Sequence, residues 1–565
     1  MRFILALSIL SAASAPGQNT FLPVSGIQAG QKGVGRTVFS GGKIEEFQVE
    51  VLGVLENVGP RQNIVLARLS GGPIERTGVL QGMSGSPVWI GGKLAGAVAL
   101  AFPFSKEPIA GIRPIEEMIA ASPSGTVAGP RAEIKWGDAR LAEVATPVRF
   151  SGFTARTVEH FAGRWREMGL SPLQGIGGQG SGGGGGGTSP KLEPGSMISV
   201  LLVSGDMQIG ADGTVTHVDR DRVYAFGHRF LSLGSTELPF SRAEVITLLP
   251  SIEVSYKISA SREPLGVVTT DGNTAIAGKL NARASTIPVT IEVAGASRRE
   301  RYRMEMARES SLTPFLLQMI LFSAIDSTER TLGSSTVSVR GEVRFEDGLP
   351  PLQLNQAFAG DVNTPIVASL SAAAPLSSLL QSGGSPVRVR EIRLSVAAGE
   401  SREIWQIEQL TASRRTVRPG DAVELAVALS SGARERVERF SYTVPVGAPL
   451  GPLNVTAADG ATTNFAESRS LFSAGSKPPA QLVAQLNSLR PNSSAWVRVW
   501  RPDASFQAGG VDLANVPAGM NLLLARSSPA PLLATQQGAR LAEFEIRLGD
   551  AVAAGTRTIQ IEVKE

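Results

Sequence analysis

The order of apolar and polar residues near the start of the chain predicts a series of β-strands. Residues 46–51 alternate strictly, so Phe47, Val49 and Val51 share one face of the expected strand. Residues 63–69 form a more continuous apolar run, which is typical of a strand covered on both faces. We therefore expect one half-buried strand followed by one that is buried throughout.

A β-hairpin is the next expected element. Residues 88–90 and 94–100 are apolar runs of strand length, and Gly91 and Gly92 between them favour a tight reversal of the chain. A short helix is expected over residues 115–121, because this stretch directly follows a proline, which is favoured at the first helical position.

The pattern changes towards the middle of the chain. Residues 144–153 fit a strand, and residues 157–169 carry apolar side chains at helical spacing. Residues 175–191 include six consecutive glycines and almost no side chain that can pack, so we expect a disordered linker. Because a long flexible loop adds little closure entropy, this linker need not divide a functional unit.

Short strands separated by turn residues are expected again after the linker. Their ranges are residues 197–203, 213–218, 222–228, 252–258 and 287–293. The clearest helix is expected over residues 315–325, which follow Thr313 and Pro314 and are apolar enough to lie against a sheet.

The last third of the chain is also rich in strand patterns. Turn signals at regular spacing within residues 405–475 predict an immunoglobulin-like β-sandwich. Residues 476–565 contain an amphipathic stretch over 480–489 and then read as a β-rich module. We expect two accessory modules here.

Composition and charge agree with a protein built mainly of strands. The chain has 565 residues, including 63 glycines and 35 prolines, so several domains with many turns are expected. A formal net charge of +4 is too small to indicate nucleic acid binding. The absence of cysteine excludes disulfides and thiolate metal sites, and three histidines argue against a multi-histidine metal centre.

The first residues have the features of a secretory signal peptide. Arg2 precedes an apolar run over residues 3–10, and small residues follow up to Ala15. We expect cleavage near Ala15 and export to the periplasm or the extracellular space. The apolar run is too short to span a bilayer and no later segment reaches that length, so no integral membrane segment is expected after signal removal.

The strongest candidate for chemistry is Ser84, just before the expected hairpin. Gly82 allows a tight turn in which its own N–H and that of Ser84 point into one small volume and hold a developing oxyanion. Gly85 leaves room for an acyl group beside the hydroxyl. The alternative interpretation is an ordinary loop, because all these residue types are common in turns.

This turn and the strands around it resemble a known family. Residues 78–87, Gly-Val-Leu-Gln-Gly-Met-Ser-Gly-Ser-Pro, the following hairpin and residues 108–118 resemble the SpoIVB peptidase family of serine endopeptidases. The resemblance covers about residues 30–120 and returns around residues 195–260. It implies a chymotrypsin-like β-barrel core, Ser84 as the nucleophile, protein or peptide substrates and no cofactor.

The resemblance also implies a general base. The dipeptide Gly227-His228 at a strand end matches the family's base-bearing segment, whereas His160 and His217 are interpreted as packing or surface residues. In the family's founding member the histidine segment precedes the serine segment, but here Ser84 comes first. Because a triad depends on geometry rather than on chain order, we expect a rearranged or circularly permuted barrel pair.

Four carboxylates stay open as the acid that orients the histidine. The family carries an aspartate ahead of the nucleophile, but residues 69–75 here contain only one acid, Glu75. Asp206, Asp219 and Asp221 lie closer in sequence to the candidate base. Without an orienting acid, a Ser–His pair loses control of the histidine tautomer and several powers of ten in rate.

Together these patterns predict a mainly β protein with a chymotrypsin-like barrel core followed by sheet-rich and immunoglobulin-like modules. The expected divisions are a signal peptide (1–15), a serine-bearing half (16–130), a connecting segment (131–174), the linker (175–191), a histidine-bearing half (192–260), an α+β or sheet-rich module (261–404) and two C-terminal modules (405–475 and 476–565). Two functions stay open. One is an exported serine endopeptidase that cleaves proteins, itself included, and the other is an inactive peptidase-like scaffold of the cell envelope.

Overall fold

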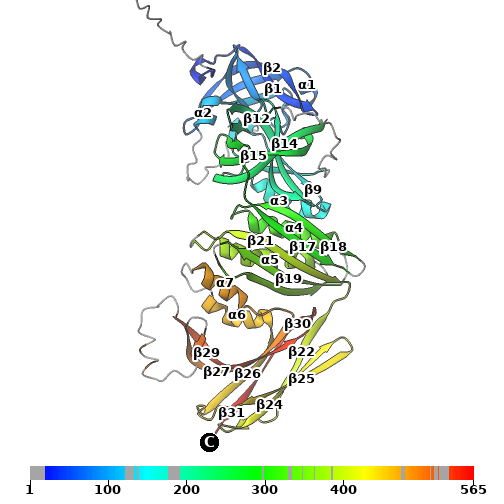
Figure 1. Cartoon of the computed structure of the whole chain (residues 1–565), viewed down its shortest axis with the longest axis vertical. Helices are drawn as coiled ribbons and strands as arrows, with labels where there is room; N and C mark the ends of the chain where they lie inside the picture. Colours follow the sequence, from blue (N-terminus) through cyan, green and yellow to red (C-terminus); the bar gives the residue numbers. More distant parts are fainter. Residues whose placement is uncertain are drawn as a thin grey trace, which may run out of the picture.

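The chain is elongated and consists of layers stacked along its long axis. The computed structural model describes residues 20–565 except 121–132, 137–138, 176–190, 296–297, 329–333, 347, 362, 384–385, 472–477, 509–510, 514–519, 521–522 and 524–532. The expected signal peptide and nearly all of the expected linker lie outside the described residues. Two β-barrels form one end, a helix-covered sheet lies in the middle, and a β-sandwich forms the other end (Figure 1).

The first barrel is closed by six antiparallel strands. They are β1 (Lys32–Ser40), β2 (Lys43–Gly59), β3 (Gln62–Ser70), β4 (Pro87–Ile90), β5 (Lys93–Ala101) and β6 (Ile109–Pro114). Their order is β4-β1-β2-β3-β6-β5, and β5 pairs back to β4. The expected hairpin is present as β4 and β5, and Phe47, Val49 and Val51 of β2 are buried as their alternation predicts.

Shorter elements lie around the first barrel. They are η1 (Val24–Gly26), α1 (Ile74–Thr77), α2 (Ile115–Ile119), β7 (Glu133–Trp136) and β8 (Ala139–Glu143). The strands β7 and β8 extend the sheet beyond β5. The helix α2 occupies the place where a short helix is expected from the sequence.

The second barrel also consists of six antiparallel strands. They are β11 (Met197–Gly205), β12 (Gln208–Asp219), β13 (Arg222–Ala225), β14 (Gly234–Leu249), β15 (Tyr256–Asp271) and β16 (Ile276–Leu280). The order is β12-β13-β16-β15-β14-β11, and β11 pairs back to β12. The expected boundary at residue 260 is therefore wrong, because β15 and β16 complete this barrel and carry it to Leu280.

A helix and two strands precede the second barrel in sequence. The strand β9 (Thr146–Ser151) pairs with β12, and β10 (Leu170–Gln174) pairs with β9. Between them lies α3 (Ala155–Glu167), near the expected range, where the Thr154 hydroxyl caps the helix by accepting from the N–H of Thr157 at 3.2 Å. Trp165 on α3 is fully buried.

The middle layer continues the sheet of the second barrel through a pairing of β11 with β18. Its strands are β17 (Thr286–Ala294), β18 (Arg299–Ala307), β19 (Ser335–Phe345), β20 (Leu352–Gly360) and β21 (Val389–Gly399). The helices α4 (Thr313–Asp326) and α5 (Thr364–Leu380) pack on this sheet and on each other (Figure 1). The sequence predicts α4 but not α5.

The C-terminal end is one sandwich rather than two modules. One sheet contains β22 (Ile404–Ala412), β24 (Ala422–Ser431), β25 (Arg434–Thr443) and β30 (Val552–Ala554). The other contains β23 (Thr416–Val417), β26 (Gly451–Asp459), β27 (Ser494–Ala508), β28 (Val511–Leu513), β29 (Leu533–Arg547) and β31 (Thr556–Val563). The expected division at residue 475 is wrong, because β30 and β31 return to pair with β22 and β26.

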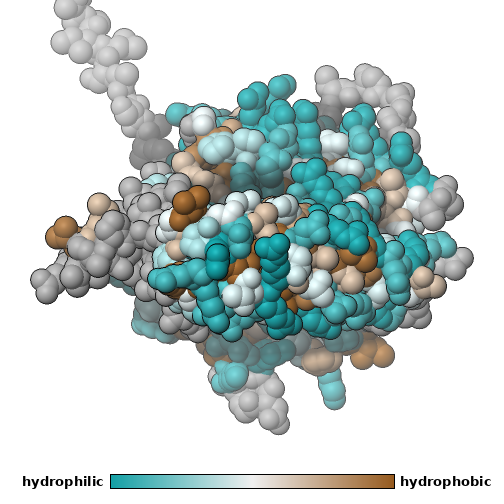
Figure 2. Space-filling view, turned by 90° about the horizontal axis from the view of Figure 1, so that it is seen from below, coloured by the Kyte–Doolittle hydropathy of each residue, from teal (hydrophilic) through white to brown (hydrophobic). Residues whose placement is uncertain are grey.

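Two helices and a polar surface complete this end. They are α6 (Gly460–Leu471) and α7 (Pro479–Asn487), and α7 lies near the range of the expected amphipathic stretch. Seen from this end, the molecule is mostly covered by hydrophilic side chains (Figure 2). The prediction of a mainly β fold with a barrel core is confirmed.

Candidate active site

The predicted nucleophile, Ser84, lies on a tight turn between α1 and β4. The N–H of Met83 donates to the carbonyl oxygen of Leu80 at 3.1 Å, so the turn is closed by its own backbone. Gly82 and Gly85 both have φ of 90°, in the left-handed region where a side chain is strained. The turn that presents Ser84 therefore depends on glycine on both sides.

Two backbone N–H groups of this turn point away from protein acceptors. Among the described residues, neither the N–H of Gly82 nor that of Ser84 donates a hydrogen bond. The N–H of Gly85, by contrast, donates to the carbonyl oxygen of Val98 at 2.8 Å and ties the turn to β5. Two such donors beside one hydroxyl have the composition of an oxyanion hole.

The turn is fastened to the second barrel through β12. The N–H of Thr214 donates to the carbonyl oxygen of Ser84 at 2.9 Å, and the Thr216 hydroxyl donates to that of Gly85 at 2.7 Å. A Cβ atom on Gly85 would lie 2.0 Å from the carbonyl oxygen of Thr214 and 2.5 Å from the nitrogen of Phe226. Only glycine lets the two barrels approach this closely.

The candidate base, His228, follows directly on this contact. Phe226 and Gly227 have φ of 72° and 70°, so the chain makes a left-handed bend just before the histidine. A Cβ atom on Gly227 would lie 3.1 Å from the carbonyl oxygen of Val98, so the bend packs against β5 of the first barrel. The structure thus brings the segments of Ser84 and His228 together at the barrel junction.

The imidazole of His228 is held on one side by its own chain. Its Nδ1 lies 2.7 Å from the carbonyl oxygen of Arg229. A carbonyl oxygen only accepts hydrogen bonds, so Nδ1 carries the proton of the neutral ring and Nε2 is the basic nitrogen. This is the tautomer that a general base towards serine requires.

Both predicted catalytic side chains are enclosed by protein. Ser84 and His228 each have 0% of their surface exposed. The Ser84 hydroxyl makes no hydrogen bond within the described part of the chain, so a direct Ser84–His228 hydrogen bond is not formed in this structure. Catalytic hydrogen bonds are often long without substrate and shorten when it binds.

The four carboxylates considered as the orienting acid lie elsewhere. The positions described for them are away from the Ser84 turn or at the surface: Asp206, Asp219, Asp221 and Glu75. The Asp206 carboxylate accepts a hydrogen bond from the backbone N–H of Arg303 at 2.7 Å. A carboxylate oxygen of Asp221 lies 3.7 Å from Nζ of Lys279. Asp219 and Glu75 are exposed. The carbonyl of Arg229 occupies the position at Nδ1 that a carboxylate takes in a triad.

A different carboxylate, Asp271, holds the loop that follows His228. It accepts from the N–H of Phe230 at 2.9 Å, of Leu231 at 2.7 Å and of Leu233 at 3.1 Å. Burial raises the pKa of the Asp271 carboxyl, and these N–H groups oppose that rise. Sequence reasoning missed Asp271, because a carboxylate that binds only backbone N–H groups has no partner side chain that a motif reveals.

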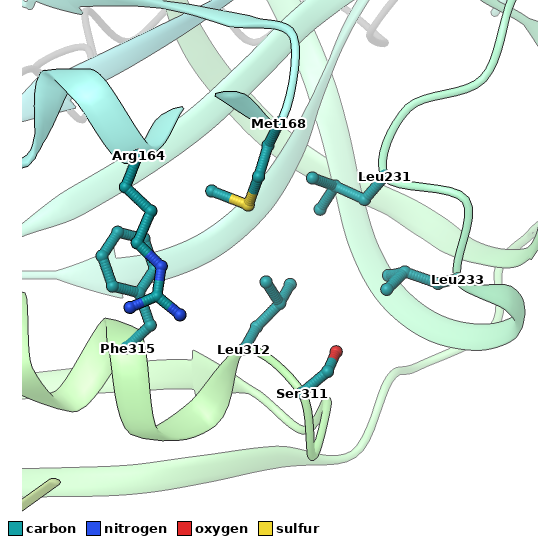
Figure 3. Close-up of a pocket in the computed structure, with 7 residues that line it drawn as sticks. All are labelled: Arg164, Met168, Leu231, Leu233, Ser311, Leu312 and Phe315. Carbon is teal, nitrogen blue, oxygen red and sulfur yellow. The ribbon is translucent and has the colours of Figure 1, made fainter. Parts of the chain in front are cut away.

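The loop held by Asp271 also borders a small apolar cavity. This cavity of about 240 Å³ lies between α3, the loop and the start of α4. Leu231 and Leu233 point into it, facing Met168 and Leu312 (Figure 3). The loop that follows His228 therefore lines one cavity together with α3 and with the start of α4 in the middle layer.

A buried lysine underlies the Ser84 turn. The side-chain carbons of Lys257 would lie 3.3 to 3.6 Å from a Cβ atom on Gly82, and its Nζ donates to the Thr37 hydroxyl at 2.7 Å. Complete burial lowers the pKa of Lys257 to about 7, against the attraction of Asp212. Asp212 in turn forms a salt bridge with Arg149, in which a guanidinium nitrogen lies 3.3 Å from a carboxylate oxygen. The sequence pattern gave no sign of this lysine.

The other two histidines lie in packing positions. His160 is exposed on α3, and its ring stacks on that of Phe322 with centroids 5.4 Å apart. The rings of His217 and Phe21 pack edge to face with their centroids 5.2 Å apart. Burial lowers the pKa of His217. Neither is at the junction turn.

No cluster of three metal-ligating side chains occurs in the described part of the chain. No helix among these residues is long and apolar enough to span a membrane.

A comparison with known protein families identifies the segment that contains the Ser84 turn. Residues 15–119 match the model of a family described as SpoIVB peptidase S55. The match includes all six strands of the first barrel and Ser84, and it ends before the segment of His228. No curated protein and no solved structure matches the chain. The predicted family resemblance is confirmed for this segment.

Proposed function

We propose, because residues 15–119 match the SpoIVB peptidase S55 family, that this chain is an exported serine endopeptidase that cleaves proteins. The observation that carries the proposal is the contact at the barrel junction. There the turn bearing Ser84, with two N–H groups that have no acceptor among the described residues, packs against the strand end that bears His228. Family membership supports the class of reaction, and this geometry supports the residues.

The proposed reaction is acyl transfer through Ser84. His228 Nε2 takes the hydroxyl proton while Ser84 Oγ bonds to the carbonyl carbon of the scissile peptide. The carbonyl oxygen becomes an oxyanion and accepts from the N–H groups of Gly82 and Ser84. The imidazolium then gives its proton to the leaving amine, the C–N bond breaks, and an acyl-enzyme remains. Water, deprotonated by His228, releases the acid and restores the hydroxyl.

The orientation of His228 in this reaction comes from a neutral group. The carbonyl of Arg229 fixes the tautomer through Nδ1, as a carboxylate does in a triad. A carbonyl stabilises the imidazolium less than a full negative charge does. We therefore expect a slower peptidase than one with an Asp in this position. We also propose that it acts on a small set of protein substrates, which includes the chain itself.

One observation favours a second candidate function, an inactive peptidase-like scaffold of the cell envelope. Ser84 and His228 are fully buried, and the hydroxyl of Ser84 makes no hydrogen bond among the described residues. In a scaffold this turn would only join the barrels. Reactivity of the hydroxyl separates the two functions.

The proposed function is tested with a fluorophosphonate probe and with casein hydrolysis. Ser84→Ala should abolish labelling and lower casein hydrolysis by about 10⁶-fold. Ser86→Ala is the matched control, because Ser86 is a buried serine of the same turn whose hydroxyl makes no hydrogen bond in the described chain. Labelling that persists in Ser84→Ala, or folded parent protein that reacts with neither reagent, would favour the scaffold.

A further inference from the structure

A buried carboxylate at the barrel junction, Glu143, has no part in the reaction described above. Its side chain is only 4% exposed and stands at the end of β8. This strand end is fixed to β5, because Glu143 pairs with Leu100 and the N–H of Val144 donates to the carbonyl oxygen of Ala99 at 2.9 Å. A buried carboxylate costs free energy unless a cation compensates it, so the partner of Glu143 matters.

That partner is Arg229, the residue that follows the candidate base. Nε of Arg229 lies 3.6 Å from Oε2 of Glu143, and the Arg229 side chain is itself only 10% exposed. The carbonyl oxygen of the same arginine lies 2.7 Å from Nδ1 of His228. Arg229 therefore holds the imidazole through its backbone and is held by Glu143 through its side chain. Because β8 extends the sheet of the first barrel, this ion pair crosses the barrel junction.

The segment around His228 requires contacts of this kind to keep its shape. Phe226 has φ of 72°, a conformation that bulky residues rarely adopt and that persists only where the surroundings enforce it. Asp271 binds backbone N–H groups of the loop beyond Arg229. Glu143 anchors the residue between these two points, whose carbonyl meets the imidazole.

Charged groups on neighbouring elements complete this part of the junction. Arg113 on β6 is 0% exposed, and the attraction of Glu117 and Glu143 opposes the lowering of its pKa by burial. Burial raises the pKa of Glu117 on α2, which lies 3.4 Å from Arg113. Buried charges are weakly screened, so loss of Glu143 would leave an excess of positive charge next to the base.

We propose that Glu143 is a positioning residue for His228. Through its ion pair with Arg229 it fixes the carbonyl that orients the imidazole, and it compensates the guanidinium charge in the residue next to the base. Its effect passes through Arg229. The inference rests on the proposed peptidase function and adds to it a carboxylate that acts on the base indirectly.

The rate of fluorophosphonate addition to the full chain tests this role. Glu143→Gln keeps the size of the side chain but removes its charge, and addition should become at least about tenfold slower. Glu133→Gln is the matched control, because Glu133 lies on the neighbouring strand β7, pairs with Arg140 at 3.6 Å and has a side chain that is 35% exposed. Its rate should equal that of the parent protein.

A double-mutant cycle shows whether Glu143 acts through Arg229. Arg229→Met should also slow addition by at least about tenfold, and Glu143→Gln/Arg229→Met should be no slower than the slower single variant. Losses that multiply in the double variant would contradict the proposed route. The double variant leaves neither partner of the pair without its counter-ion, so it remains informative if Glu143→Gln does not fold. A parent-like rate in it would overturn the proposal.

The pH dependence of the addition rate gives a readout that a merely structural role would not move. Addition requires neutral His228, so the rate rises with pH through a midpoint. Glu143→Gln leaves the positive charge of Arg229, which disfavours the imidazolium, and the midpoint should fall by about 0.5 pH unit. Arg229→Met leaves the negative charge of Glu143, and the midpoint should rise by a similar amount. The double variant should return close to the parent value.

NMR of the histidine rings separates this proposal from the peptidase. The chain has three histidines, so the signal of His228 in labelled protein is identified by its loss in His228→Gln. If that signal titrates with the expected opposite shifts but the parent protein does not react with fluorophosphonate, the positioning role is supported and the peptidase is refuted. If Ser84 reacts and the parent, both single variants and the double variant share one rate and one midpoint, the peptidase is supported and the positioning role is refuted.

Discussion

At the scale of single residues, the junction depends on one glycine. Gly85 lies where the backbones of β12 and of the bend before His228 meet the Ser84 turn. Its φ of 90° excludes a larger residue, and so does the carbonyl oxygen of Thr214, which would lie 2.0 Å from a Cβ atom at this position. The same contact that holds the barrels together therefore sets the position of the predicted nucleophile.

Gly85→Ala should open the barrel junction. The added methyl group cannot be accommodated beside two backbones, and overpacking of this kind costs about 3 kcal/mol. We expect increased hydrogen exchange in β12 and loss of fluorophosphonate labelling. Gly53→Ala in β2 is the control, because its Cβ atom would meet nothing within 4 Å. A variant Gly85→Ala with unchanged exchange and labelling would contradict this role.

Lys257 should make the stability of the second barrel depend on pH. Its pKa is lowered to about 7 in the folded chain from the ordinary value of 10.5, so between these values the unfolded state binds the extra proton. Stability therefore rises with pH from about 7 to 10.5 and is lowest below 7. The slope contributed by this group is up to about 1.4 kcal/mol per pH unit.

Hydrogen exchange of β12 and β15 between pH 7 and 9 measures this slope, after correction for intrinsic exchange rates. Lys257→Met should flatten the dependence. Lys279→Met is the control, because the side chain of Lys279 is 60% exposed. This variant should show the same pH dependence of hydrogen exchange as the parent protein. Equal slopes in the parent and in Lys257→Met would show that the lysine does not titrate in this range.

At the scale of elements, Asp271 at the end of β15 fixes the loop after His228. Asp271→Ala leaves at least three backbone N–H groups without their acceptor, so residues 230–233 should exchange faster. Displacing His228 should lower kcat by roughly 10²-fold with little change in KM. Asp271→Asn, which keeps an acceptor oxygen, should recover part of kcat. A change confined to KM would argue against a positioning role.

Local patterns in the sequence predicted many elements but not their long-range pairing. The hairpin of β4 and β5 and the helix α4 were predicted because their signals lie within a few neighbouring residues. The helix α5 was missed, because it contains Pro375 and its alanine and serine residues give no apolar stripe. The join of β30 and β31 to the sandwich was missed, because these strands return from the chain end.

At the scale of the whole molecule, the two predicted catalytic residues lie on two successive barrels. The barrel with Ser84 comes first and the barrel with His228 second, whereas the family resemblance implies the opposite order of these two segments. The approach of the two segments through Thr214 and Gly85 was not predictable, because it depends on how two closed barrels pack.

The rate of fluorophosphonate addition to Ser84 tests the central claim most directly. Intact mass and peptide mapping give the site of the adduct, and its rate is compared in the parent protein, His228→Gln and His217→Gln. A single adduct on Ser84 is expected, formed at least about 10²-fold more slowly in His228→Gln and at the parent rate in His217→Gln. An adduct on another residue, or an unchanged rate in His228→Gln, would contradict the account.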